Sequence, residues 1–566
     1  QAGVSMGKRC RHCLVEFTVP SDDLEFLERV SPVIGAERQL IPAPTLCPMC
    51  RWQRRLMFRN ERTLYYRTSS LSGKRIFSMH PEDAPFPVYT ITEWRSDAWD
   101  AATYGRDVDF SRPFFGQFQE LCNQVPHYSL LVLPFVDENS EYTNCAGYSK
   151  NCYLISQAEY NEDCYYARGI HGCKDCCDCL RINHCELCYE CVDLNECYYC
   201  LYCSECNNSS ECYFSSELRS CRYCFGCHSL VNAEYCIFNK QVSREEWEVF
   251  LEKFSFTRDN INSTLTKSTE LSLKTPKLWA HMTQCENCTG DHIRNCRDSH
   301  FVFDSQDLDH CKYCFEVSCS AAYCQDLAMP GLNVELLYEC LICFDSVYQV
   351  LFSKQCCESV RDLMYCDSCF PGVQNCFGCY GLQRKQYCLL NKAYSQHEYE
   401  KLVTRVISLM RETGEWGEFF PPELSPFGYN ETIADEYFPL SRAEVLKRGW
   451  NWREEPESET SAALVVAPNE PVRALDESIL GAIYRCRDTG KPYRVIKPEL
   501  QFYHRMQLPL PDTSPAARHK LRVKLRNPCI LLNRSCSRCK APIVTTYAPE
   551  RSKQVLCEAC YLGKIY

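Results

Sequence analysis

The chain has 566 residues, of which 46 are cysteines, and its formal net charge is −11. That length is too great for a single hydrophobic core, and the cysteine content means that cysteine packing or cysteine chemistry dominates the fold. No run of eighteen apolar residues occurs and the first residues lack an apolar signal core, so we expect a soluble, cytoplasmic protein that does not enter a membrane. Residue 1 is Gln, which leaves an upstream targeting segment open.

The N-terminal segment carries two Cys-x2-Cys pairs, Cys10 with Cys13 and Cys47 with Cys50. This spacing is typical of a zinc ribbon, in which two tight knuckles hold one Zn²⁺ between four thiolates. The insert predicts a helix from Asp22 to Val30 that is capped by Ser21. Residues 68–92 have a similar hairpin outline without the cysteines, so a ribbon there would have lost its metal.

Two basic segments adjoin the cysteine pairs at the two ends of the chain. Residues 51–75 carry eight Lys/Arg against one acid, and residues 485–540 carry fourteen against three. Arginines interleaved with aromatic residues beside a zinc ribbon favour contact with RNA or DNA. A solvated basic face, or an intramolecular partner for the acidic middle of the chain, is an equal alternative. The candidate nucleic-acid-binding residues are Arg51, Arg54, Arg55, Arg59, Arg62, Arg522, Lys524 and Arg526.

Residues 152–236 form a sequence repeat. Cysteines occur every twelve residues from Cys152 to Cys236, and most other cysteines of the segment keep a period of three. That period fits neither a helix nor an ordinary strand, but it fits short coils stacked as a solenoid, with one residue in three pointing inward. The aromatic residues that follow inward cysteines would face outward or lie along the edge of the coil, and these are Tyr153, Tyr165, Tyr189, Tyr213 and Phe225.

The solenoid cysteines allow three interpretations. They can be small apolar fillers with free thiols, they can form disulfides between adjacent coils, or they can hold metal ions or Fe–S clusters. Serine and alanine replace cysteine at some inward positions, which favours packing. The candidate metal ligands or core thiols are Cys173, Cys176, Cys179, Cys185, Cys188, Cys191, Cys197, Cys200 and Cys203.

An internal duplication follows the first repeat. Residues 223–250 match residues 375–402 at twelve of 28 positions. Both copies end in a capping box, Ser243-x-x-Glu246 and Ser395-x-x-Glu398, which predicts an amphipathic helix that closes each solenoid. In the second copy Cys324, Cys340 and Cys356 are sixteen apart, so its coils are irregular and we assign it no register.

The C-terminal part contains one more short helix, a linker and a second ribbon. Ser441-x-x-Glu444 and Gly449 bracket the predicted helix, and residues 454–476 have the composition of a flexible linker. Cys536, Cys539, Cys557 and Cys560 then repeat the zinc-ribbon spacing, and the residues between the two pairs predict a hairpin.

The predicted fold is mainly β, with two tandem cysteine-lined β-solenoids that carry short capping helices and are flanked by N- and C-terminal zinc ribbons. The predicted domains are an N-terminal ribbon with a basic helix (1–66), a degenerate ribbon and α+β connector (67–143), a first solenoid with its helix (144–260), a second, irregular solenoid with its helix (261–412), a connector and linker (413–476), and a basic C-terminal ribbon domain (477–566).

Several segments carry a resemblance to known proteins. They read CPMCRWQRRLMFRNERTLYYR, WRSDAWDAATYGRDVDFSRPFF, FGYNETIADEYFPL and TYAPERSKQVLCEACY. Together they resemble a group of uncharacterised cysteine-rich zinc-ribbon proteins from reduced-genome bacteria, and the resemblance covers nearly the whole chain. It implies a bacterial origin and the same full-length architecture. The group has no settled activity, so it supplies no mechanism.

No Ser-His-Asp, HExxH, P-loop or GxGxxG pattern occurs, and the thirteen histidines are scattered, so an enzyme is not favoured. Our hypothesis is a non-catalytic scaffold with two structural Zn²⁺ sites. Its basic ribbons would engage RNA, DNA or a ribonucleoprotein, and the solenoid face would offer a surface to a protein partner. The alternative is an Fe–S or multi-metal protein for electron transfer or metal storage.

Overall fold

The computed structural model describes residues 5–133, 135–328, 338–339, 342–343, 348–351, 354–356, 360–454 and 463–565. Cys340 and residues 455–462 of the predicted linker lie outside the described residues. The chain forms two compact units, and each unit joins two separated stretches. Unit 1 comprises Gln1–Ser129 with Ala280–Arg453, and unit 2 comprises Leu130–Trp279 with Glu454–Tyr566.

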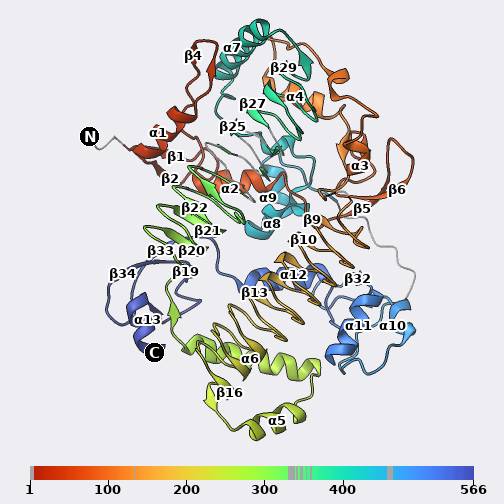
Figure 1. The fold of residues 1–566 in the computed structure, drawn as a ribbon, viewed down its shortest axis with the longest axis vertical. Coiled ribbons are helices and arrows are strands. Elements are labelled where there is room, and N and C mark those ends of the chain that lie inside the picture. The colour runs from red at the N-terminus through yellow and green to blue at the C-terminus, as the bar shows by residue number, and fades with distance from the viewer. Residues whose placement is uncertain are drawn as a thin grey trace. The chain divides into compact units, whose positions relative to one another are not determined.

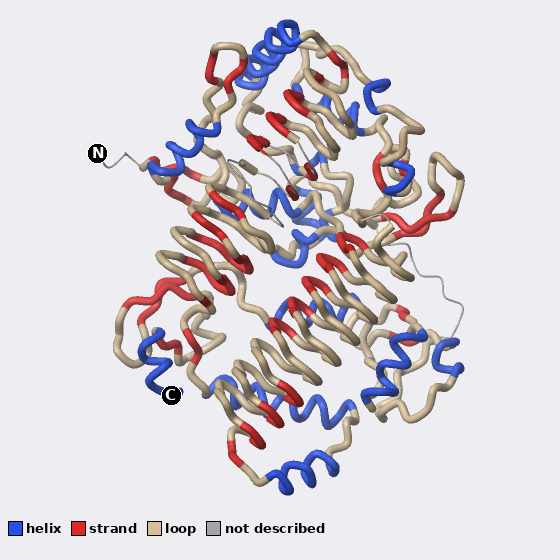
Figure 2. Tube along the Cα trace, viewed as in Figure 1, coloured by secondary structure: helices blue, strands red, loops and turns tan. Residues whose placement is uncertain are grey.

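The secondary structure is 25% helix and 26% strand, arranged in many short sheets. Strand therefore exceeds helix only slightly, although the sequence predicted a mainly β chain. The reason is local, because a typical coil of the cysteine repeat contributes a strand of only four residues and spends the rest of its length in bends (Figure 2).

A ladder of parallel strands occupies residues 144–237 of unit 2 (Figure 1). Paired residues are twelve apart, as Ser156 with Arg168 and Leu180 with Val192 show. The offset equals the cysteine spacing of the sequence. The strands are β9 (Asn144–Gly147), β10 (Ser156–Glu159), β11 (Arg168–His171), β12 (Leu180–Asn183), β13 (Val192–Asn195), β14 (Ser210–Tyr213), β15 (Arg222–Phe225) and β16 (Glu234–Ile237), and β17 (Lys240–Gln241) ends this series with an antiparallel pairing.

The period of three has a backbone cause. Asp175, Asp178 and Arg181 have φ values of 52°, 53° and 55°, and each lies two residues after a cysteine that points inward. A left-handed residue at every third position turns the chain back toward the inside. Such a conformation costs a non-glycine residue roughly 1–2 kcal/mol. Hydrogen bonds between coils offset part of that cost, as when the N–H of Asp178 donates to the carbonyl of Tyr165 at 3.0 Å.

This geometry predicts opposite effects of glycine at two exposed glutamates of the ladder. Glu196 has a φ of 53°, whereas Glu186 is outside the left-handed set. We expect Glu196→Gly to raise the free energy of unfolding by about 0.5–1 kcal/mol and Glu186→Gly to lower it by about as much. Urea denaturation of both variants checks this, and a change in the same direction for both would contradict it.

The interior of the ladder is filled by thiols and by aliphatic side chains. Cys176, Cys188 and Cys200 are fully buried in three consecutive coils, and Ile182 and Leu194 are buried beside them. The aromatic residues that follow inward cysteines do leave the coil, as predicted, but they do not form an accessible face. Most of them are buried in a second core with residues of unit 2 helices, and these are Tyr165, Tyr189, Tyr213 and Phe225.

Helices and short strands cover the ladder within unit 2. The capping box of Ser243 with Glu246 starts α5 as predicted. A second helix, α6, was not predicted, because its sequence is rich in Asn, Ser and Thr and lacks a strong apolar stripe. The remaining elements are α5 (Arg244–Lys253), α6 (Arg258–Lys274), β18 (Lys277–Leu278), α10 (Glu477–Gly481), β31 (Tyr484–Arg485), β32 (Pro492–Tyr493), α11 (Lys497–Met506), α12 (Pro515–Leu525), β33 (Leu532–Ser535), β34 (Pro542–Thr545), β35 (Val555–Leu556) and α13 (Glu558–Ile565).

His228 links the ladder to α6. Its Nδ1 lies 2.7 Å from Ser216 Oγ and its Nε2 lies 3.0 Å from Ser268 Oγ. Burial, with a smaller contribution from Lys277, lowers the pKa of His228 from 6.5 to about 3. The folded state therefore keeps this imidazole neutral, while the unfolded chain binds a proton below pH 6.5.

Acidification should consequently destabilise unit 2. Between pH 6.5 and pH 5 the unfolded state gains about 2 kcal/mol from protonation of His228. We expect His228→Gln to lose correspondingly less stability than the wild type when urea unfolding is repeated at pH 7 and pH 5. Equal losses in the two proteins would contradict the assignment.

Unit 1 begins with the N-terminal cysteine pairs. The predicted helix is present as α1, but Pro20 holds the N-cap position and no side chain caps the helix, so the prediction of a Ser21 cap is wrong. The hairpin predicted over residues 68–92 does not form as such, because residues 65–68 pair with residues 75–78, and residues 88–89 pair in parallel with residues 127–128. The elements are β1 (Met6–Arg9), β2 (Glu16–Val19), α1 (Ser21–Val30), β3 (Val33–Ile34), β4 (Glu37–Arg38), α2 (Pro48–Leu56), β5 (Tyr65–Thr68), β6 (Arg75–Ser78), β7 (Val88–Tyr89), α3 (Ile91–Trp94), α4 (Phe114–Cys122) and β8 (His127–Tyr128).

A second parallel ladder belongs to unit 1, and its offset varies. Met282 pairs with Ile293 eleven residues on, Val302 pairs with Gly290 twelve residues before it, and Leu308 pairs with Ala321 thirteen residues on. The irregular cysteine spacing reflects these unequal coils. The strands are β19 (Met282–Thr283), β20 (Thr289–Arg294), β21 (His300–Gln306), β22 (Leu308–Asp309), β23 (Ala321–Ala322), β24 (Ile342–Cys343), β25 (Tyr348–Leu351), β26 (Gln355–Cys356), β27 (Arg361–Met364), β28 (Gln374–Phe377) and β29 (Cys388–Leu389), and β30 (Lys392–Ala393) ends this series with an antiparallel pairing.

The helices after the second ladder begin where the sequence predicts. Ser395 with Glu398 starts α7 (Gln396–Glu412), and Ser441 with Glu444 starts α9 (Arg442–Lys447) after a short α8 (Ile433–Tyr437). Gly449 follows α9 with a φ of 76°, as expected for a residue that ends a helix. Within the described ranges, no helix combines the length and the apolar character that crossing a membrane requires.

Candidate metal centres and buried arginine clusters

The N-terminal cysteines come together as the sequence predicts. One donor atom from each of Cys10, Cys13, Cys47 and Cys50 lies within 4.8 Å of the others. The first pair sits in the turn between β1 and β2, and the second pair lies at the start of α2. Hydrogen bonds, first of all with Cys50, lower the pKa of Cys47 to about 5 and so favour the thiolate that a metal requires. This group could hold one metal ion.

The C-terminal group repeats the same local design with Cys536, Cys539, Cys557 and Cys560. In both groups the residue after the first pair is left-handed, Leu14 in one and Lys540 in the other, each with a φ of 63°. Its N–H donates to the carbonyl of the first cysteine at 3.0 Å in each case. Two knuckles of equal geometry therefore arise at opposite ends of the sequence, one in each unit.

The segment between the C-terminal pairs is not the hairpin that the sequence predicted. β34 pairs with β33 on the N-terminal side of the knuckle, and β35 pairs in parallel with β18. The knuckle, rather than the longer insert, forms the hairpin turn. The insert strand β35 instead joins the ribbon to the segment that follows α6.

The ladder cysteines are arranged differently from metal ligands. Cys176 Sγ donates to the carbonyl of Lys174 at 3.2 Å, and Cys200 Sγ donates to the carbonyl of Tyr198 at 3.6 Å. Every cysteine whose state is described is a free thiol. Over the part of the chain that the structure describes, no three ladder cysteines bring their sulfur atoms within 4.8 Å of one another. These cysteines therefore do not surround a single ion in the way that the two Cys₄ groups could.

Serine reproduces the cysteine contact at two inward positions. Ser209 Oγ donates to the carbonyl of Asn207 at 2.9 Å, and Ser215 Oγ donates to the carbonyl of Tyr213 at 2.8 Å. Both bonds run to the residue two positions earlier, as the thiol bonds do. The position therefore selects a small side chain that can donate one hydrogen bond. Burial raises the pKa of Cys176 and Cys191, which keeps both thiols protonated and suited to this role.

The basic segment of unit 1 is buried. Arg51 Nη2 and Arg55 Nη1 each lie 3.0 Å from a different oxygen of Asp326, and the exposed fraction of these three side chains is 4% or less. Arg54 pairs with Glu339 at 2.7 Å and with Glu418 at 2.8 Å. A single α2 turn thus directs three arginines at carboxylates of the same unit.

Unit 2 contains an equivalent cluster on α12. Arg518 Nε and Arg522 Nη2 lie 2.9 and 3.0 Å from the two oxygens of Asp178, which is fully buried. Arg522 also pairs with Glu190 at 2.9 Å, and Arg518 with Glu499 at 3.2 Å. Burial alone would raise the pKa of Asp178, but Arg518 and Arg522 outweigh it and hold the pKa below its usual value.

The two clusters share one pattern, a Tyr, an Asp and a Glu in three successive coils. We call each such set of stacked residues a column. In each cluster, two arginines four residues apart on one helix both form ion pairs with the Asp of the column. The columns are Tyr166–Asp178–Glu190 with φ values of 54°, 53° and 51°, and Tyr313–Asp326–Glu339 with 55°, 60° and 55°. Arg518 Cζ lies 5.3 Å from the Tyr166 ring, and Arg51 Cζ lies 5.1 Å from the Tyr313 ring. The duplication therefore includes the contact between ladder and helix.

These clusters correct the predicted nucleic-acid-binding residues. Five of the eight are buried within their own unit and cannot reach a phosphate, and these are Arg51, Arg54, Arg55, Arg59 and Arg522. Arg526 pairs with Asp193 at 2.8 Å, Arg62 is partly buried, and Lys524 is exposed. For these buried arginines the contacts show the intramolecular alternative, because their partners are acidic residues of the same unit.

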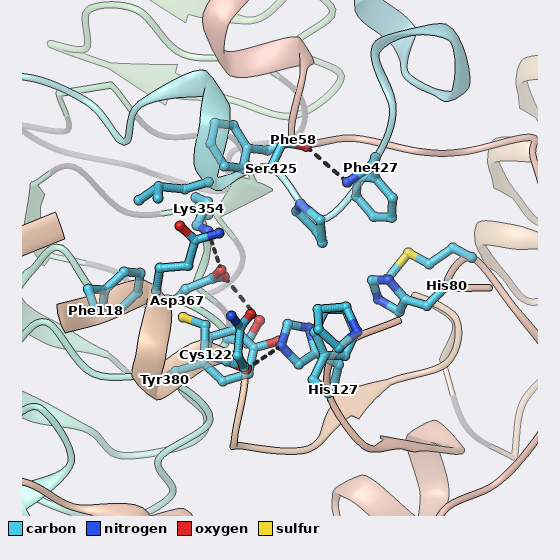
Figure 3. Close-up of a pocket in the computed structure, with 18 of the residues that line it drawn as sticks. Phe58, His80, Phe118, Cys122, His127, Lys354, Asp367, Tyr380, Ser425 and Phe427 are labelled. Atoms are coloured by element: carbon cyan, nitrogen blue, oxygen red, sulfur yellow. Dashed lines mark hydrogen bonds and ion pairs between the residues drawn. The ribbon is translucent and has the colours of Figure 1, made fainter. Parts of the chain in front are cut away.

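Unit 1 also contains a cavity of about 210 Å³ that brings a cysteine and two histidines together (Figure 3). Cys122, His80 and His127 line it, with the ion pair of Lys354 and Asp367 at 2.8 Å on another side. Aromatic side chains supply much of the remaining wall. Sequence reasoning missed this group because its members come from segments that lie far apart in the chain.

The chemistry of the cavity does not suit nucleophilic catalysis. Burial raises the pKa of the Cys122 thiol and lowers the pKa of His127 to about 4. His127 Nε2 lies 3.0 Å from the Cys122 carbonyl oxygen, so this nitrogen is engaged by the backbone. A cysteine nucleophile needs a thiolate beside a proton-accepting imidazole. Both pKa shifts act against that pair.

Comparison with known proteins gives no family. No protein-family model matches the chain, and no curated protein matches it.

Proposed function

We propose that the chain is a non-catalytic scaffold in which two cysteine-lined β-solenoids are each held by an arginine-bearing helix and a zinc ribbon. The observation that supports the proposal is that the ladder cysteines and the arginines of the basic segments make contacts inside the protein. Ladder thiols donate to backbone carbonyls, and the arginines of both basic segments clamp ladder carboxylates. Such internal contacts make the ladders rigid, as a binding platform requires.

Zn²⁺ is the ion that best suits the two Cys₄ groups. Four thiolates within one short radius favour a tetrahedral ion that accepts sulfur ligands, and structural zinc is bound in this way. The zinc would stabilise the ends of the two units without taking part in a reaction. The resemblance to uncharacterised cysteine-rich zinc-ribbon proteins of reduced-genome bacteria is compatible with this role and adds no activity to it.

The basic side chains that are exposed on the C-terminal ribbon favour nucleic acid as the partner. Arg538 and Lys540 flank Cys539 in the C-terminal knuckle, and Lys553 and Lys564 are exposed on the same ribbon. Exposed cations on a rigid ribbon can neutralise phosphates. We therefore move the proposed RNA- or DNA-binding surface from the buried arginines to these four side chains.

The binding experiment compares two double variants with equal change of charge. Arg538→Glu with Lys540→Glu alters the proposed surface, and Lys240→Glu with Lys253→Glu alters exposed lysines elsewhere in unit 2. Fluorescence anisotropy with labelled single-stranded RNA and duplex DNA should show salt-sensitive binding that the first pair weakens by about tenfold or more and the second leaves nearly unchanged. Equal effects of both pairs, or no binding by the wild type, would reject the nucleic-acid proposal.

A further inference from the structure

A cluster of two histidines and one aspartate lies at the start of the second ladder, outside both Cys₄ groups. His281, Asp291 and His292 each place one donor atom within 4.8 Å of the other two. His281 precedes β19, while Asp291 and His292 belong to β20 (Figure 1). In the sequence the histidines are scattered, and His281 and His292 are eleven positions apart.

The ladder register brings the two imidazoles together. Met282 pairs with Ile293, so the preceding residues His281 and His292 are neighbours on adjacent coils. Their ring centroids are 4.5 Å apart, and the ring planes differ by 18°. The two rings therefore offer nitrogen donors next to each other, within reach of one ion.

Asp291 occupies a position that is otherwise apolar. Its partner in the next coil is Phe303, which in turn pairs with Phe315. Only 2% of Asp291 is exposed. Its Oδ1 accepts hydrogen bonds from the backbone N–H groups of His281 and His292 at 2.7 and 3.0 Å and lies 2.9 Å from His281 Nδ1. These contacts fix a carboxylate beside both imidazoles, and this is a donor set that divalent transition ions accept.

A local irregularity places the carboxylate. The register shifts between Thr289 and Gly290, where the pairing offset changes from eleven to twelve residues. Gly290 has a φ of 152°, and a Cβ atom there would lie 1.7 Å from the carbonyl oxygen of Val302. Only glycine permits this close approach of β20 to β21. Such irregularities re-aim the following side chain, which here is Asp291.

We propose that His281, Asp291 and His292 form a third metal-binding site, which takes a divalent first-row transition ion such as Zn²⁺. Imidazole nitrogens and a carboxylate oxygen are established ligands of this ion class. A neighbouring group of Asp298, Asp309 and His310 also places its donors within 4.8 Å of one another, but it has one imidazole instead of two, is more exposed, and contains Asp309, which already pairs with Arg297 at 2.8 Å. That second group is the matched control.

Equilibrium dialysis of the full-length protein against low-micromolar Zn²⁺ tests the site. The wild type should bind three ions, His292→Ala should bind two, and His310→Ala should bind three. His292→Ala leaves the contacts of His281 with Asp291 in place, so a folded protein is expected, and far-UV circular dichroism checks it. A wild type that binds two ions, or a folded His292→Ala variant that still binds three, would overturn the proposal.

A second measurement needs no variant. Co²⁺ added stepwise to metal-free protein should give thiolate charge-transfer absorption for the two Cys₄ equivalents. One further equivalent should add only the weak visible bands of a site without sulfur. If no equivalent binds without the thiolate band, the third site does not exist, whatever His292→Ala does.

Discussion

Replacing Asp178 by alanine is expected to lower the free energy of unfolding of unit 2 by about 3–5 kcal/mol. The variant leaves Arg518 and Arg522 in a site where their side chains are 3% exposed or less, without the carboxylate that both contact. Breaking a buried pair by removing one partner costs more than the pair itself contributes, because the remaining charge has lost its hydration. Urea denaturation, with hydrogen exchange to assign the loss to unit 2, measures the effect.

Two further variants test the cause of this loss of stability. One keeps the shape of the Asp178 side chain without its charge, and the other removes an ion pair on the surface instead of in the interior. Asp178→Asn keeps an acceptor oxygen and should fall between the wild type and Asp178→Ala. Glu162 pairs with Lys150 and Lys174 at 3.7 and 3.5 Å on the ladder surface, where these side chains are 39–52% exposed. Glu162→Ala should therefore cost less than about 1 kcal/mol. An Asp178→Ala effect as small as that of Glu162→Ala would show that the clamp does not hold the helix to the ladder.

Replacing Cys536 by serine is expected to release one metal ion and to unfold the C-terminal ribbon. Structural zinc sites contribute roughly 10–16 kcal/mol to the folding of small zinc peptides, so a ribbon without its ion cannot retain its structure. Elemental analysis should show one zinc fewer per chain. Hydrogen exchange should show lost protection in β33, β34 and α13, with the ladder strands of unit 2 largely unchanged.

The control for this substitution is a thiol outside the Cys₄ groups. Cys288 Sγ donates to the carbonyl of Glu286 at 3.1 Å, and serine can make the same bond. Cys288→Ser should keep the full metal content and the protection of the C-terminal ribbon. Unchanged zinc in Cys536→Ser would contradict the assignment of this group as a metal centre.

The features that the sequence predicted well are encoded locally or by regular spacing. The cysteine period of twelve gave the offset of the first ladder, and each capping box gave the first residue of a helix. The Cys-x2-Cys pairs identified both Cys₄ groups, since each knuckle is a short turn whose geometry depends on neighbouring residues. In such cases the residues that decide the structure lie within one turn or one repeat.

The predictions that failed depend on contacts between distant segments. Arg51 meets Asp326, which lies 275 residues further along the chain, and Arg518 meets Asp178 across 340 residues. A basic, aromatic helix looks the same in sequence whether its arginines face solvent or a buried carboxylate. The same limit explains why Tyr189 was expected on an open face, although residues of α11 such as Tyr503 pack against it.

The left-handed residues illustrate a different limit. Tyr166 and Glu190 adopt φ values above 50°, where propensity favours glycine or asparagine. Hydrogen bonds to the adjacent coils stabilise this backbone, and those bonds exist only once the coils are stacked. The period of three was therefore visible in the sequence, whereas its backbone cause was not.

The central claim is that the ladder cysteines pack the core as free thiols, while metal is held at the Cys₄ groups. The most direct measurement is the content of zinc, iron and acid-labile sulfide in anaerobically purified protein, combined with a thiol count after unfolding without reductant. The account predicts zinc, no iron, no labile sulfide, and all 46 cysteines reactive as thiols once a chelator has removed the metal. Several irons with matching sulfide per chain, or a large deficit of thiols, would contradict it.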